Sequence, residues 1–176
     1  HVGHLRSASI GEALKRLAIC MGNEAVGDVH LGDFGLQMGL IIGELEERGE
    51  LEKDFTIGEL EEIYPFASAK AKEKNADGSL KNEEYANRAK DITVRLQKGE
   101  EKYKKAWEKI MKVSIAYLNK NYDALDVHFE IWKGESDAEP YFPRLIEILE
   151  EKGLSYRSNG ALVVDIAEPG DKKELP

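Results

Sequence analysis

Two histidines three residues apart stand at the start of the chain, in the stretch HVGHLRSASIGEA. Behind His1 and His4, apolar residues recur every three to four positions, which predicts a helix over residues 5–20. The first N–H groups of a helix lack partners inside it and carry the positive end of its dipole, so they favour an anion such as phosphate. The pattern predicts an anion site, and phosphate is the usual occupant of such a site.

A metal site and an expression tag are the alternatives for this histidine pair. A structural zinc site needs four ligands, and Cys20 and His30 are the only further candidates nearby, so no metal is expected. Purification tags are also rich in histidine. The chain, however, runs from Gly3 straight into an amphipathic helix, which a tag has no reason to do.

Further polar residues follow the predicted strands. Asp33 and Gln37 come after the first strand, and Glu135 and Ser136 come after a later one. Because sites of α/β proteins form at the carboxyl ends of strands, we expect these residues to line a site. For Asp33 alone, the pattern favours the simpler role of a helix N-cap, and Gln37 could face solvent.

The remaining candidate ligands receive structural interpretations. Cys20 is expected to be a small buried hydrophobe. His30 and His128 alternate with apolar neighbours on predicted strands, so we expect them to be structural.

Composition indicates a globular protein. The 176 residues are 34% charged and 41% hydrophobic, enough for one domain with a sizeable core or one domain with an insertion. A single cysteine excludes an internal disulfide and fits a reducing, cytoplasmic compartment. No apolar stretch approaches the length of a membrane span. The net charge of −9 argues against unspecific coating of DNA or RNA but permits a local basic face.

The first part of the chain, residues 1–48, has the pattern of half a parallel α/β unit. The helix over residues 5–20 would bury a single apolar face, formed by Leu5, Ile10, Leu14, Leu17 and Ala18. A strand is predicted around residues 26–31 and a helix over residues 36–47. Glycines at every fourth position (35, 39 and 43) predict that this helix lies very close to another backbone.

Residues 49–121 read as an all-helical insertion. Thr56 is the expected cap of one helix and Pro65 a kink or break within it, and two more helices follow over about 83–98 and 101–121. Residues 122–176 return to the α/β pattern, with a strand over 127–134, a helix closed by Gly153 and a hairpin turning at Asn159-Gly160.

Lysines line one face of the last inserted helix. Lys102, Lys105, Lys109 and Lys112 follow 3-4-3 spacing, opposite Trp107 and Ile110. Most stripes of this kind are ordinary solvated faces. The functional alternative is a surface that contacts RNA.

Several stretches together resemble a known family. HVGHLRS is similar to the His-x-Gly-His signature of class I aminoacyl-tRNA synthetases, which nucleotidylyltransferases also carry. With it, the stretches VHLGDFGLQMG, LQKGEEKYKKAWEKI, HFEIWKGES and SNGALVVD resemble, in this order, the catalytic domain of bacterial arginyl-tRNA synthetases. The likeness runs from His1 to about Ile166.

The resemblance implies a partial Rossmann-like nucleotide-binding fold with a helical insertion. It implies an arginine–tRNA ligase that uses ATP with Mg²⁺, arginine and tRNA(Arg), acts as a monomer, and needs no membrane or DNA. His1, Gly3 and His4 would contact ATP, with His1 and His4 as the catalytic pair. His1, Asp33 and Gln37 would line the arginine, and the four lysines would contact tRNA.

The chain also departs from the family pattern. The strand before the signature, the second half of the nucleotide fold, the second signature and the anticodon-binding domain are absent from it. We therefore expect a fragment that begins within an active site and does not form arginyl-adenylate alone. The alternatives are a non-catalytic synthetase-like module that binds RNA or protein, and a nucleotidylyltransferase that shares only the histidine signature.

Overall fold

The computed structural model describes residues 2–158 and 160–166, with side chains from Leu5 onward. It is a mixed α/β structure that is mostly helical and contains a small parallel sheet. Contacts divide the chain into two compact units, residues 1–136 and 137–176. Each unit is described by itself below.

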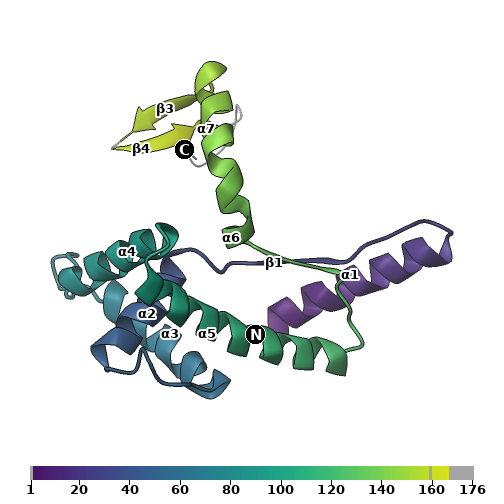
Figure 1. The fold of residues 1–176 in the computed structure, drawn as a ribbon, viewed down its shortest axis with the longest axis horizontal. Coiled ribbons are helices and arrows are strands. Elements are labelled where there is room, and N and C mark those ends of the chain that lie inside the picture. The colour runs from purple at the N-terminus through teal and green to yellow at the C-terminus, as the bar shows by residue number, and fades with distance from the viewer. Residues whose placement is uncertain (1, 159, 167–176) are drawn as a thin grey trace. The chain divides into compact units, whose positions relative to one another are not determined.

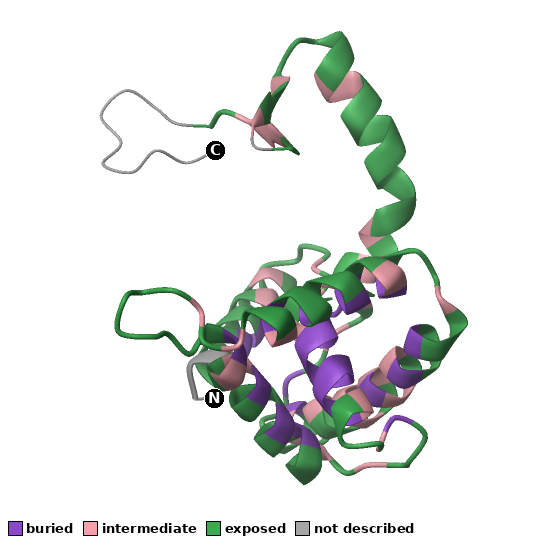
Figure 2. Ribbon diagram, turned by 90° about the vertical axis from the view of Figure 1, so that its left-hand side faces the viewer, coloured by how far each residue is buried: buried purple, intermediate pink, exposed green. Residues whose placement is uncertain are grey.

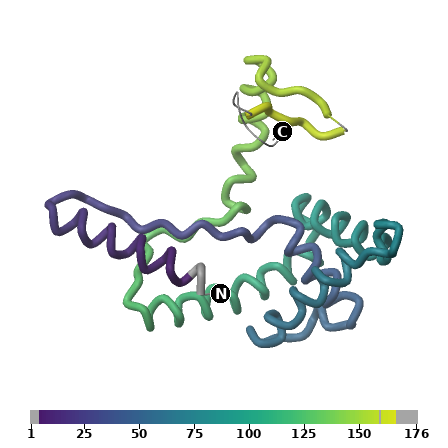
Figure 3. The backbone as a smooth tube through the Cα atoms, turned by 180° about the vertical axis from the view of Figure 1, so that it is seen from behind, coloured from purple at the N-terminus to yellow at the C-terminus, as the bar shows by residue number. Residues whose placement is uncertain are grey.

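The first unit contains most of the helices. In chain order its elements are α1 (Val2–Cys20), β1 (Asp28–Leu31), α2 (Leu36–Glu47), α3 (Ile57–Lys72), α4 (Glu83–Gln97), α5 (Glu101–Ala124) and β2 (Ile131–Gly134), with α6 (Glu135–Ala138) beginning at its end. Figures 1 and 3 show β1 inside a long extended connection between α1 and α2. The helices predicted over 5–20, 36–47, 83–98 and 101–121 are confirmed, with ends shifted by a few residues.

The strands β1 and β2 form a parallel pair. Asp28 lies opposite Ile131 and Leu31 opposite Gly134, so both strands end at the same edge. The second strand is shorter than predicted. Val127 donates its N–H to the carbonyl of Tyr122 near the end of α5, and the strand begins only at Ile131.

Helices α2–α5 form the helical cluster, which holds the main apolar core (Figure 2). Its largest fully buried side chains are Ile42, Leu45, Ile92 and Ile110. Gly39 explains the close packing of α2 on α4: a Cβ there would lie 2.2 Å from the carbonyl oxygen of Ala89. The close approach predicted from the glycine spacing is thus confirmed at this position.

Helix α3 begins with the predicted cap. The Thr56 Oγ1 accepts from the N–H of Glu59, and the Glu59 carboxylate accepts from the N–H of Thr56 at 2.6 Å, which completes a capping box. Pro65 does not break the helix, which continues through it to Lys72. Because α2 packs directly on α3 and α4, α2 shares the core of the inserted helices. The domain boundaries expected at residues 48 and 121 stay a prediction.

The predicted inner face of α1 is wrong. Leu14 is 62% exposed, and Leu5, Ile10 and Leu17 are exposed as well. The face that meets the rest of the unit carries Ala8, Glu12 and Lys15 instead. It lies beside the second half of α5, where Ala8 packs with Tyr122 and Val127 (Figures 1 and 3). Cys20, expected to be buried, is also exposed.

The second unit consists of a short 3₁₀ turn (Glu139–Tyr141), α7 (Phe142–Glu151), β3 (Ser155–Ser158) and β4 (Ala161–Val164). The predicted helix and antiparallel hairpin are confirmed, with Ser158 opposite Ala161 across the turn. Gly160 has a positive φ of 84°, as a tight hairpin requires. Asn159 lies outside the described residues. No residue of α7 is buried, as the green ribbon in Figure 2 shows.

Within the described residues, none of the helices combines the length and apolar character that crossing a bilayer would need.

Candidate active site at the strand ends

The parallel pairing of β1 and β2 brings the predicted polar residues to one edge. The residues that follow β1 form the strand-end turn, Gly32–Gln37, and those that follow β2 are Glu135 and Ser136. Asp33, in the turn, accepts two hydrogen bonds from Ser136, one from its N–H at 3.1 Å and one from its Oγ at 2.6 Å. The two partners are 103 residues apart in the chain.

Asp33 is therefore not the N-cap of α2, the simpler interpretation of the sequence. The N-cap is Gly35, and it makes no side-chain capping bond. Asp33 is only 4% exposed. A Cβ on Gly134 would lie 2.5 Å from the Asp33 carboxylate, so the strand must end in glycine for this carboxylate to fit.

The rest of the turn is also fixed by polar contacts. The Gln37 amide donates to the carbonyl of Gly32 at 3.0 Å, and the N–H of Phe34 donates to the Glu135 carboxylate at 3.3 Å. From the helical cluster, the Trp107 indole donates to the carbonyl of Asp33 at 2.7 Å. Gln97 donates to the carbonyl of Phe34 at 3.0 Å. The turn is thus tied to β2 on one side and to α4 and α5 on the other.

A cavity of about 510 Å³ lies between the start of α1 and the strand β1. Ser7, Ala8 and Gly11 of α1 form one wall, and β1 with Gly32 forms another. A Cβ on Gly11 would meet nothing within 4 Å, so this wall is open. The cavity extends from the second and third turns of α1 to Gly32, the first residue of the strand-end turn, and Leu118, Tyr122 and Phe129 complete its lining.

The signature histidines are placed only in part. His1 lies outside the described residues, and the structure describes no side chains for residues 2–4. The backbone of His4 falls within the first turn of α1, which begins at Val2. His4 therefore lies at a helix start, as predicted, and the position of His1 stays a prediction.

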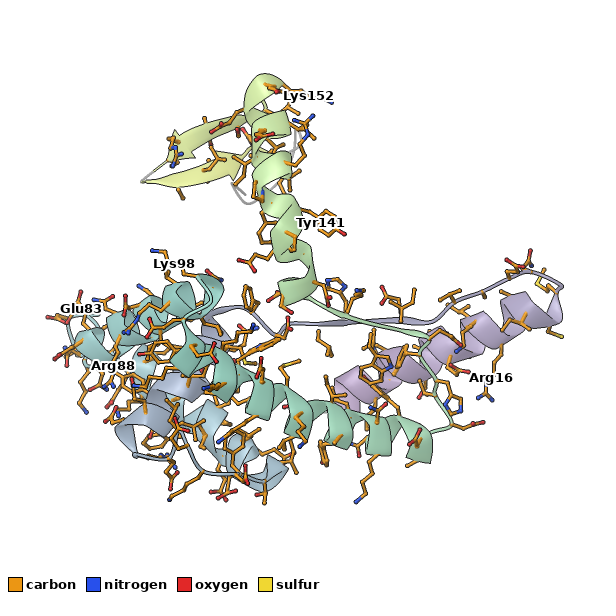
Figure 4. The ribbon with its side chains drawn as sticks, in the orientation of Figure 1. Arg16, Glu83, Arg88, Lys98, Tyr141 and Lys152 are labelled. Atoms are coloured by element: carbon orange, nitrogen blue, oxygen red, sulfur yellow. The ribbon has the colours of Figure 1, made fainter. Side chains whose placement is uncertain are left out.

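Charged side chains hold α1 against the strands. The α1 ionic cluster consists of Glu12, Lys15, Arg16, Asp126 and Glu130. Arg16, labelled in Figure 4, donates to Glu12 at 2.7 Å and pairs with Asp126 at 2.9 Å. Lys15 pairs with Glu12 at 3.0 Å and with Glu130 at 3.1 Å. Glu130 also accepts from the N–H of Gly27, just before β1, at 2.6 Å.

These contacts change the acidity of Glu12. The hydrogen bond from Arg16 lowers the pKa of the Glu12 carboxyl from 4.5 to about 2. Burial of the group acts in the opposite direction, but bonds from the His128 N–H and from Lys15 add to the effect of Arg16. Glu12 is consequently a buried carboxylate that stays ionised at neutral pH.

The predicted lysine stripe lies on α5 as expected, but its members differ. Lys102 pairs with Glu46, and Lys109 donates to the carbonyl of Glu52 at 2.7 Å. Lys105 is exposed and pairs loosely with Glu101 at 3.4 Å. Lys112 is exposed. The first two lysines therefore stabilise the helical cluster, and the other two present their charge to solvent.

Sequence reasoning missed the residues that support the site from a distance. The pattern places Trp107 on the helix face opposite the lysines, and it gives Gln97 and Glu12 no role in the site. The contacts of these three side chains join elements far apart in the chain. Their partners lie far away in the chain, so no local signal in the sequence marks these three residues. Among the residues that the structure describes, no three His, Cys, Asp or Glu side chains gather to hold a metal ion.

Comparison with known proteins assigns the chain to a family. Residues 1–175 match the family described as class I tRNA synthetases (R), catalytic domain. The chain is 50% identical to the arginine–tRNA ligase of Agathobacter rectalis and covers 30% of that protein. It is 43% identical to the arginine–tRNA ligase of Alkaliphilus oremlandii and covers 31% of it. Both alignments include all of this chain.

A solved structure shows the same fold. The arginyl-tRNA synthetase of Plasmodium falciparum matches 100% of this chain with a TM-score of 0.71, at 24% identity and over 28% of its own length. The chain therefore spans about 30% of the length of the relatives that it matches. It belongs to the catalytic-domain family of class I arginyl-tRNA synthetases.

Proposed function

We propose that this chain forms part of the ATP and arginine site of a cytoplasmic, monomeric arginine–tRNA ligase. In the first step the arginine carboxylate attacks the α-phosphate of ATP, which forms arginyl-adenylate and releases pyrophosphate. In the second step the arginyl group moves to the 3′ end of tRNA(Arg). The arrangement that carries the proposal is the common edge of β1 and β2, where Gly32 of the strand-end turn borders the cavity beside Ser7, Ala8 and Gly11 of α1.

The ATP would lie at the start of α1. Gly3 and His4 lie in the first turn of a 19-residue helix, whose N–H groups and dipole favour phosphate, and His1 precedes them in the sequence. Negative charge grows on the phosphate oxygens in the transition state, so two histidine donors there would lower the barrier. Mg²⁺ would enter with the nucleotide. The surrounding α/β elements would be one part of a Rossmann-like fold.

The arginine would bind at the strand-end turn. Gln37 and Glu135 stand on the two sides of that edge, and Asp33 lies beneath it. A guanidinium group is a fork of donors that prefers carboxylate and carbonyl oxygens. The edge supplies acceptors of this kind, and it has no lysine or arginine among Gly32–Gln37 and Glu135–Ser136 to repel a cation.

Pyrophosphate exchange tests the proposed reaction. In the longest gene product that contains this chain, arginine with tRNA should drive exchange of labelled pyrophosphate into ATP, and lysine should not. His4→Ala should slow the exchange by about a hundredfold, because one donor to the developing charge is lost. Lys74→Ala, on an exposed loop, serves as the control. Exchange without arginine, or equal exchange with another amino acid, would refute the proposal.

The tRNA would contact the exposed part of the lysine stripe. Because Lys102 and Lys109 are engaged within the helical cluster, charge reversal at Lys105 and Lys112 is the cleaner test. The double variant Lys105→Glu/Lys112→Glu should raise the KM for tRNA and reduce its dependence on salt, with the KM for ATP unchanged. The matched control is Lys90→Glu, an exposed lysine on α4. An unchanged KM for tRNA at low salt would mean that the stripe is an ordinary solvated face.

A further inference from the structure

We infer that Asp33 is a positioning residue, which fixes the strand-end turn against β2 and so holds the arginine-binding edge in one geometry. The inference rests on the proposed function for its consequence in catalysis. Its structural basis is independent of that function.

The Asp33 carboxylate fills a space built for it. It is 4% exposed, and its two oxygens each accept one hydrogen bond from Ser136. Gly134, the last residue of β2, leaves the room that the carboxylate occupies, since a Cβ there would lie 2.5 Å from it. Three residues from two strand ends therefore interlock at one point.

The backbone of Asp33 extends this connection to the helical cluster. Its carbonyl accepts from the Trp107 indole on α5 at 2.7 Å. Phe34, the next residue, donates to Glu135 through its N–H and accepts from Gln97 through its carbonyl. Release of the Asp33 side chain would loosen the turn that carries Gln37. A small displacement of a bound substrate lowers the reaction rate by orders of magnitude. We therefore expect loss of the Asp33 side chain to reduce the rate strongly, even where the free energy of unfolding changes little.

Direct contact with the arginine guanidinium is the competing role for Asp33. A direct contact needs the negative charge of the carboxylate, and Asn would then be as harmful as Ala. Positioning needs only the hydrogen bonds to Ser136. Asn can supply these, because its amide oxygen accepts from the N–H and its amide nitrogen donates to Oγ.

Steady-state exchange kinetics in the longest gene product that contains this chain separate the two roles. Asp33→Ala should lower kcat/KM for arginine by about a hundredfold and leave the KM for ATP within about twofold. Asp33→Asn should stay within about threefold of the unchanged protein. Gly134→Ala should lower kcat/KM for arginine about as much as Asp33→Ala does. In the double variant the loss should be little larger than in Asp33→Ala alone, because the missing carboxylate makes room for the new methyl group. Asp91→Ala, on the exposed face of α4, is the control.

A spectroscopic readout on the chain itself does not depend on activity. The indole N–H resonance of Trp107 should shift in Asp33→Ala and keep its position in Asp33→Asn. If Asp33→Ala does not fold, Ser136→Ala against Ser136→Thr gives the same comparison, because threonine retains the hydroxyl donor.

The outcomes separate the inference from the proposed function. If the unchanged protein shows no arginine-dependent exchange, the proposed function is refuted. The Trp107 resonance in Asp33→Ala then still tests whether Asp33 fixes the strand-end turn. Normal exchange with an unmoved Trp107 resonance in Asp33→Ala overturns the inference. Equal losses in Asp33→Asn and Asp33→Ala would also overturn it, in favour of direct contact.

Discussion

Helix α1 and the helical cluster are held by different physical means. The cluster buries branched apolar side chains, with Ile42 fully buried, around the close contact at Gly39. Helix α1 turns its larger apolar side chains, such as Leu14, to solvent and meets the strands through the α1 ionic cluster. Figure 2 shows the buried residues gathered mainly in the cluster.

This difference indicates which part of the first unit is the more stable and which part can move more easily. Apolar burial supplies most of the favourable free energy of a fold, whereas paired charges gain little once their lost hydration is counted. The helical cluster should therefore be the stable body of the first unit. Helix α1, whose first turn contains His4, should be the part that docks and undocks.

The largest expected effect is that of opening the cluster core. Ile42→Ala should lower the free energy of unfolding by about 2–5 kcal/mol, because it leaves a cavity in a fully packed site. Leu14→Ala, at an exposed position of α1, should change it by less than about 0.5 kcal/mol. Urea titration of the chain measures both. Equal losses in the two variants would contradict the comparison.

Adding a methyl group at the α2–α4 contact comes next. Gly39→Ala should cost about 1–3 kcal/mol, because the new Cβ meets the backbone of Ala89, which cannot move aside as a side chain could. In Gly58→Ala the nearest atom is 3.9 Å away, so this helical control should be neutral or slightly stabilising. Thermal melts of the two variants should move in opposite directions or differ clearly in size.

Acid should separate α1 from the cluster. Because the pKa of Glu12 is lowered to about 2, its contribution to stability is full above pH 4.5 and is lost as the pH falls toward 2. Arg16 likewise lowers the pKa of Asp126, and the Gly27 N–H lowers that of Glu130. In the helical cluster, burial raises the pKa of Glu46 but hydrogen bonds from Lys102 and Arg88 outweigh it and lower this pKa, and the apolar core remains when the carboxylate is protonated.

The two tryptophans can report this separation. Trp132 packs with Tyr122 and Phe129 near α1, whereas Trp107 bonds to the strand-end turn. In single-tryptophan variants the emission of Trp132 should change at a higher pH than that of Trp107. Glu12→Gln should shift the Trp132 signal already at neutral pH and flatten its acid response. A simultaneous change of both tryptophans would show that the two regions unfold as one.

The smallest expected effect concerns a local cap. Thr56→Ala removes one half of the capping box of α3 and should cost about 1 kcal/mol. Thr56→Ser, which keeps the hydroxyl acceptor, should cost a few tenths of that. Thermal unfolding of the two variants makes the comparison, and equal losses would mean that the hydroxyl does not act as a cap.

Features that depend on neighbouring residues were predictable from the sequence. The Thr56 cap, the four-residue glycine spacing and the Asn159-Gly160 hairpin signal each correctly placed an element, since local spacing sets helix starts, helix faces and tight turns. The polar edge at the ends of β1 and β2 was predictable too, because parallel strands end together.

Features that depend on distant partners were not. An Asp before a helix has the pattern of an N-cap, and nothing local shows that its partner is Ser136. In α1 the apolar period is real, but periodicity does not tell which face of a helix meets the rest of the unit, and the charged face does so here. The beta strand predicted over 127–134 begins only at Ile131, and Val127 bonds near the end of α5.

Titration of the isotope-labelled chain with Mg²⁺–ATP tests most directly whether its nucleotide site lies between α1 and the strand ends. Amide resonances of Ser7, Gly11 and Gly32, around the cavity of about 510 Å³, should shift in a saturable way, and His4→Ala should weaken the binding. Resonances of the exposed start of α4, near Glu83 and Arg88, should not move (Figure 4). Shifts confined to α4, or none at millimolar nucleotide, would contradict the account.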